Sequence, residues 1–230
     1  MNSEARNARG QGAGWIEVIT GSMFSGKSEE FVALYSDPTH YAKQENTTFS
    51  KGPVSDVRQI AGCEGTHVPQ ANADCLILGM GYDDELVRRV AESKEDARKI
   101  QMYGLPSLAA DMYQESVLRS FKASEALGPW WDDRCFAPAN DPFATANVLQ
   151  ERVRQEKASS GLTNLYLSPL GTKPQVLGFA LYFATERRGT PTSIIFPFTD
   201  GYEQETSKGL ARTWVYNVEH LVSHGDGLKR

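Results

Sequence analysis

The chain has 230 residues, of which 40% are hydrophobic and 23% charged, the composition of an ordinary soluble globular protein. Its formal net charge of −5 argues against broad nucleic-acid binding, and no apolar run approaches the roughly 18 residues of a membrane span. Its 3 cysteines show no metal-binding spacing and suit a reducing compartment, so we expect a cytoplasmic protein.

Three segments can be distinguished along the chain. Residues 1–14 are polar and glycine-rich and lack the apolar core of a secretion signal, so we expect a flexible tail. Residues 15–74 combine a glycine turn with a loop-rich stretch that predicts one short strand. Residues 75–230 form a regular succession of elements. The sequence leaves open whether the second and third segments share one sheet.

The segment Gly-Ser-Met-Phe-Ser-Gly-Lys-Ser fits the phosphate-loop pattern Gly-x-x-x-x-Gly-Lys-Ser/Thr. The run 15–19 before it predicts a buried strand, and the run 28–34 after it predicts the first turns of a helix. Such a turn aims backbone N–H groups and the positive helix end at one point, where a phosphate fits. We expect Lys27 to contact the outer phosphates and Ser28 to bind Mg²⁺. The predicted nucleotide-binding residues of this loop are Gly21, Ser22, Met23, Phe24, Ser25, Gly26, Lys27 and Ser28.

Residues 14–30 resemble the phosphate-loop region of the bacterial type of thymidine kinase. The resemblance implies ATP and Mg²⁺ as cofactors and a nucleoside as the acceptor of a phosphoryl group. Two features of that family are missing: the string Asp-Glu-x-Gln-Phe-Phe and the paired Cys-x-x-Cys motifs. The resemblance therefore favours nucleotide binding more than it favours thymidine as substrate.

From residue 75 onward the chain repeats a unit of strand, glycine or proline turn, and helix. With the phosphate-loop unit before it, this repetition predicts an α/β fold with a largely parallel, Rossmann-like sheet and helices on both faces. The turns that follow the strands then meet at one edge, where ligands of such sheets bind. The predicted strands are 75–80, 99–104, 134–137, 164–167 and 193–198, and the predicted helices start near residues 83, 109, 143 and 174.

Phosphoryl transfer needs a carboxylate that orients the acceptor hydroxyl and helps to hold the metal. Asp83 and Glu85 follow the predicted strand 75–80 and are the candidate catalytic residues. Asp141 holds an equivalent place in a later turn. The alternative is that these carboxylates only complement the positive end of a helix. Arg212 is a further candidate for a phosphate contact.

A second loop, Gly-Thr-Lys-Pro-Gln at residues 171–175, precedes the last predicted helix. We expect Pro174 at the first helical position, Thr172 as its cap and Lys173 near the positive helix end, an arrangement that can bind an anion. The loop resembles the Gly-Thr-Lys-Pro loop of the Rossmann-like domains that sense cyclic oligonucleotides in CRISPR-associated systems. The alternative is a well-capped turn with a solvated lysine.

Two functions follow from these motifs. The first is an ATP-binding phosphotransferase, a nucleoside kinase if the resemblance extends beyond the phosphate loop. The second is a non-catalytic nucleotide-sensing or defence-associated module that uses the 171–175 loop. Both predict a nucleotide or nucleoside as partner and no membrane association. The sequence leaves open whether the chain is catalytic and whether it forms a homo-oligomer.

Overall fold

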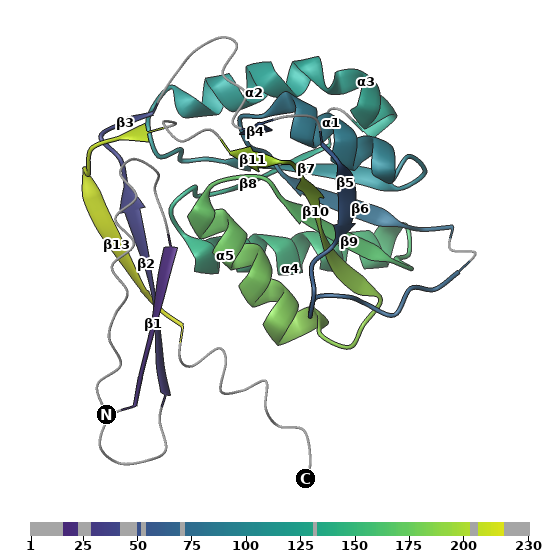
Figure 1. Ribbon diagram of the computed structural model, residues 1–230. Helices are drawn as coiled ribbons and strands as arrows, with labels where there is room; N and C mark the ends of the chain where they lie inside the picture. Colours follow the sequence, from purple (N-terminus) through teal and green to yellow (C-terminus); the bar gives the residue numbers. More distant parts are fainter. Residues whose placement is uncertain are drawn as a thin grey trace.

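The structure is a computed structural model, and it describes residues 16–22, 29–41, 50–51, 54–69, 72–130, 133–202 and 207–218. A six-stranded sheet covered by helices makes up most of it, and a three-stranded sheet lies beside the larger one (Figure 1). The predicted tail at residues 1–14 lies outside the described residues.

The six-stranded sheet has the strand order β5-β10-β9-β6-β7-β8. Every neighbouring pair is parallel except β5 and β10, which are antiparallel. The prediction of a largely parallel, Rossmann-like sheet is therefore confirmed. The strands are β5 (Asp56–Gln59), β6 (Cys75–Gly79), β7 (Arg98–Gly104), β8 (Arg134–Ala137), β9 (Leu165–Pro169) and β10 (Thr192–Phe198).

Helices cover both faces of this sheet, as predicted (Figure 1). Alternate residues of β6 point to opposite faces: Leu76 packs with the side chains of α1 and α3, whereas Ile77 packs with those of α4 and α5. Both faces are buried, which explains why the strand reads as a continuous apolar run. The helices are α1 (Asp84–Ser93), α2 (Met112–Lys122), α3 (Ser124–Leu127), α4 (Pro142–Ser159) and α5 (Lys173–Tyr182), with a 3₁₀ turn at Gly128–Trp130 and a π-helical turn at Phe183–Arg187.

The smaller sheet consists of β1 (Ile16–Ser22), β2 (Glu29–Asp37) and β13 (Arg212–Asn217), all antiparallel, with β2 in the middle. The prediction of a helix over 28–34 is therefore wrong, because residues 29–34 belong to a strand. The reason is tertiary: from Val32 to Asp37 every second residue is buried, with Ala33 and Tyr35 packed near Leu181 of α5, and that period of two is incompatible with a helix.

The smaller sheet rests on the larger domain through a third apolar cluster. Ala33 and Tyr35 of β2 and Tyr216 of β13 pack with Leu181 of α5. Two pairs of short strands complete the described fold. They are β3 (His40–Tyr41) with β12 (Ser207–Lys208), and β4 (Ser50–Lys51) with β11 (Gly201–Tyr202). No helix among the described residues is long and apolar enough to cross a membrane.

Candidate functional site

The carboxyl edge of the large sheet, formed by the C-terminal ends of its parallel strands, is where the sequence predicts a site. The chain leaves β6 towards β7 on one side and later places β9 on its other side. The strand order therefore reverses between β6 and β9, which is the position where open α/β sheets bind ligands.

The loops that follow β6 and β9 pack directly against each other at this position. The N–H of Leu170 donates to the carbonyl oxygen of Gly79 at 3.0 Å. A Cβ atom on Gly81 would lie 2.0 Å from the carbonyl oxygen of Leu170, so no larger residue fits without moving the loop. The loops after β6 and β9 are therefore in close backbone contact at the candidate site.

The loop from β9 to α5 carries Lys173, which the structure places at the first residue of the helix, so Pro174 is second and not first as predicted. The side-chain oxygen of Gln175 accepts a hydrogen bond from the N–H of Thr172 at 3.3 Å. The hydroxyl of Thr172 donates to the carbonyl oxygen of Ala139 in the β8–α4 loop. The Thr172 hydroxyl thus connects the β9–α5 loop to the β8–α4 loop at the carboxyl edge.

The β8–α4 loop also contacts the smaller sheet. The hydroxyl of Tyr216, in β13 of the smaller sheet, donates to the carbonyl oxygen of Asn140 at 2.6 Å. The ring of Tyr216 also packs edge-on against Phe143, with ring centroids 6.4 Å apart. The smaller sheet therefore borders the carboxyl edge of the larger one.

Lys173 is the cationic residue at the end of the β9–α5 loop. The residue is half-buried, and burial lowers the pKa of its ammonium group because the charged form loses hydration. Within the described part of the chain, no carboxylate forms an ion pair with Lys173. The positive end of α5 adds to the same potential. An ammonium group in this setting favours an anion from outside the protein.

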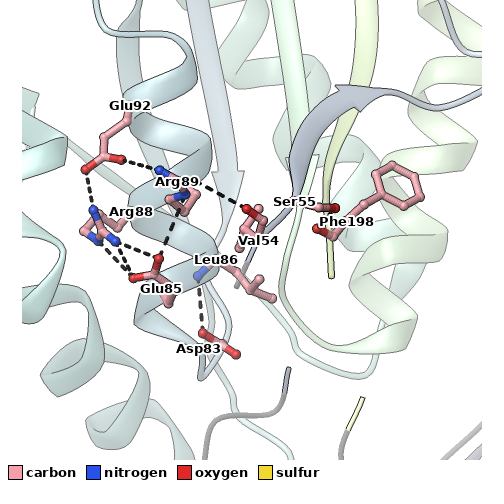
Figure 2. Close-up of polar contacts among 9 residues, drawn as sticks. All are labelled: Val54, Ser55, Asp83, Glu85, Leu86, Arg88, Arg89, Glu92 and Phe198. Carbon is pink, nitrogen blue, oxygen red and sulfur yellow. Dashed lines mark hydrogen bonds and ion pairs between the residues drawn. The ribbon is translucent and has the colours of Figure 1, made fainter. Parts of the chain in front are cut away.

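The two candidate catalytic carboxylates both have structural contacts at the start of α1 (Figure 2). Asp83 is the N-cap, and its Oδ1 accepts from the N–H of Leu86 at 3.2 Å. Glu85 pairs with Arg88 at 2.6 Å, and Arg88 pairs with Glu92 at 2.8 Å. These contacts correspond to the alternative of helix-end complementarity, and a catalytic role for either carboxylate stays a prediction.

The predicted phosphate loop is mostly outside the described residues. Gly21 and Ser22 end β1, and β2 starts at Glu29 as its antiparallel neighbour. The helix that would aim its positive end at the loop is absent from the described residues 29–37, where β2 lies. The remaining predicted ligands of the nucleotide and of Mg²⁺ lie outside the described residues: Met23, Phe24, Ser25, Gly26, Lys27 and Ser28.

The other candidates also have structural partners. Asp141 caps α4 by accepting from the N–H groups of Phe143 and Ala144, both at 2.9 Å. Arg212 pairs with Asp37 at 3.1 Å and links β13 to β2. These residues stabilise the elements that border the site.

The sequence prediction missed a cation and two aromatic rings beside this edge. Phe196 and Phe198 of β10 are half-buried, and their rings meet at 79° with centroids 6.1 Å apart. The guanidinium carbon of Arg58, in β5, lies 4.0 Å from the centroid of the Phe198 ring. The alternation of phenylalanines in Phe-Pro-Phe could have indicated two rings on one face, but pairing with Arg58 is a long-range contact.

Among the described residues, no group of three or more His, Cys, Asp and Glu side chains is placed to hold a metal ion. Comparison with known protein families and with solved structures finds no match for this chain.

Proposed function

We propose that this protein binds a phosphate-bearing nucleotide at the carboxyl edge of its large sheet and serves as a nucleotide-sensing module, the second of the two functions that the sequence predicts. The observation that carries the proposal is Lys173: a half-buried ammonium group at the start of α5, beside the reversal of strand order, with no carboxylate partner in the described structure.

Burying an ammonium group is unfavourable unless an opposite charge compensates it. The pKa of Lys173 is lowered by burial alone, so the described protein does not supply the compensation. A phosphate group at the start of α5 would supply it and would also accept hydrogen bonds from the helix end.

The phosphotransferase prediction rests on the sequence alone. Its loop lies outside the described residues, and Asp83 and Glu85 contact the start of α1 (Figure 2). ATP and Mg²⁺ as cofactors, and a nucleoside as acceptor, stay predictions of the resemblance in residues 14–30.

Calorimetric titration with ATP, thymidine and cyclic di-AMP separates the two functions. We expect at least one nucleotide to bind without turnover, and Lys173→Ala to weaken that binding about 10- to 100-fold, the value of a charge-assisted hydrogen bond. Lys157→Ala, at an exposed position near the end of α4, is the matched control and should bind as the wild type does.

Two results would contradict the proposal. In the first, Lys173→Ala binds every nucleotide as tightly as the wild type. In the second, Lys27→Ala abolishes binding and the wild type transfers phosphate from ATP to thymidine, which would establish the phosphotransferase instead.

A further inference from the structure

We infer that Arg58, Phe196 and Phe198 form a stacking platform for the base of the bound nucleotide. The inference rests on the proposed function, because it assigns the other end of a ligand whose phosphate contacts Lys173. It requires the ligand to carry a planar ring as well as an anionic group.

The register of the sheet places the platform beside the Lys173 loop. β10 runs parallel to β9, with Ile194 opposite Leu167. β9 ends at Pro169, while β10 continues to Phe198. The last residues of β10 therefore extend beyond the end of β9, to the level at which the chain turns through the loop towards Lys173.

The platform and Lys173 also lie on the same face of the sheet. Ile194 packs in the cluster formed with α4 and α5, and Ile195 in the opposite cluster formed with α1. Because side chains alternate along a strand, Phe196 and Phe198 share the face of Ile194, which is the face that α5 covers. In Figure 2 the ring of Phe198 points away from α1 and its arginines. α5 starts at Lys173 on this face.

The chemistry of the platform suits a nucleobase. Bases stack on aromatic rings and on the planar guanidinium group of arginine, whatever their sequence. Arg58 is exposed, and its described contact is with the ring of Phe198, at 4.0 Å. Its charge also favours a ligand that carries phosphate.

Backbone and side-chain contacts within the protein hold the platform in place. Both the N–H and the hydroxyl of Ser55 donate to the carbonyl oxygen of Phe198, at 2.8 Å and 2.9 Å. In addition, β10 pairs with β5 in the antiparallel direction, and Phe198 lies opposite Asp56. A preorganised surface loses less entropy on binding than a mobile one.

The test compares ATP with inorganic triphosphate, which carries the phosphate chain of ATP but no ring. Cyclic di-AMP is titrated as a second ligand that carries bases. The variants are Phe198→Leu, Arg58→Ala and the ring-retaining control Phe198→Tyr. Thermal unfolding of each variant is recorded in parallel, so that a loss of fold is not taken for a loss of binding.

We expect the wild type to bind at least one nucleotide more tightly than inorganic triphosphate, and Phe198→Leu to weaken that nucleotide about 5- to 150-fold, the range of a base–aromatic stack. Triphosphate binding should not change in Phe198→Leu, and Phe198→Tyr should retain nucleotide affinity. Arg58→Ala should weaken nucleotide binding as well.

The inference is overturned if Phe198→Leu and Phe198→Tyr bind nucleotide equally, or if nucleotide and inorganic triphosphate bind equally in the wild type. In both cases a loss of binding in Lys173→Ala would leave the proposed function standing. If Lys173→Ala has no effect on any of the three ligands, the proposed function fails and the inference fails with it.

Discussion

The amino and carboxyl edges of the large sheet differ in whether their cations form ion pairs. At the amino edge, where the parallel strands begin, Arg98 pairs with Asp133 at 2.8 Å and with Glu156 at 3.1 Å, and Arg152 pairs with Glu156 at 3.0 Å. At the carboxyl edge Lys173 has no carboxylate partner in the described structure.

The difference separates charges that are paired within the fold from a charge that has no ion pair within the described residues. The amino-edge network balances two cations with two carboxylates and ties the starts of β7 and β8 to the end of α4. Burial beside it raises the pKa of Cys75 and of Cys135 to about 12, so both thiols stay protonated. At the carboxyl edge, the described carboxylates Asp83 and Asp141 accept from helix N–H groups, and neither forms an ion pair with Lys173.

The largest effect on stability is expected from Glu156→Ala at the amino edge. The Glu156 side chain is only 4% exposed and serves both arginines. Its removal leaves partly buried cations without full compensation, which should lower the free energy of unfolding by about 3–5 kcal/mol in urea denaturation. Glu151→Ala, which breaks the exposed pair with Arg154 on the same helix, is the control. Equal stability of the two variants would contradict the comparison of the edges.

Gly81→Ala tests the contact between the loops of the carboxyl edge. The new Cβ would lie 2.0 Å from the carbonyl oxygen of Leu170, so one loop must move. We expect a loss of about 1–3 kcal/mol in the free energy of unfolding, as for overpacked cores, and weaker nucleotide binding. A variant with wild-type stability would show that the loops separate freely.

Tyr216→Phe tests whether the smaller sheet supports the site. The change deletes the donor to the carbonyl oxygen of Asn140 and keeps the ring against Phe143. We expect a loss of about 0.5–1.5 kcal/mol in the free energy of unfolding. Tyr113→Phe, on α2, is a control with the same chemistry away from this loop. A change no larger than the control's would mean that the hydrogen bond adds no net stability.

The pH dependence of the free energy of unfolding, compared between the wild type and Lys173→Met, tests whether the Lys173 charge is uncompensated. Burial lowers the folded-state pKa of Lys173 below its ordinary value of 10.5, so the unfolded chain binds more protons between the two values. The free energy of unfolding of the wild type should therefore gain a rising component as pH increases through that window, and Lys173→Met should lack this component. The variant should also be slightly more stable at neutral pH. A steeper rise in the variant than in the wild type would contradict the assigned sign.

The smallest effect is expected from Arg88→Ala. Its pairs with Glu85 and Glu92 are exposed helix-surface contacts, which contribute little in water (Figure 2). The urea midpoint should not shift measurably. A clear shift would show that exposed pairs on α1 matter as much as the amino-edge network.

The large sheet could be predicted from the sequence because its elements are local. The central strand β6 is a short apolar run, and two helices start where a carboxylate can cap them, as Asp83 and Asp141 do. The parallel order then follows from repetition of one unit. The position of Lys173 at the carboxyl edge follows in the same way.

The remaining parts depend on contacts between distant segments, which a local pattern does not encode. The acidic pair Glu29 and Glu30 suggests the first turn of a helix, yet these residues lie in β2, which β13 flanks about 180 residues later in the chain. Which of the described carboxylates lie near Lys173 is a property of the folded arrangement. So is the pairing of Arg58 with Phe198 across two strands.

The β8–α4 loop receives one hydroxyl donor from each side: Thr172 binds the carbonyl oxygen of Ala139, and Tyr216 binds that of Asn140. Two adjacent carbonyl groups of this loop therefore accept hydrogen bonds from different parts of the fold, one from the start of α5 and one from β13. A protein shortened before β13 would keep all six strands of the large sheet and yet expose one of these peptides to water. The strand β13 thus supports a loop of the carboxyl edge, although it is remote from that loop in the sequence.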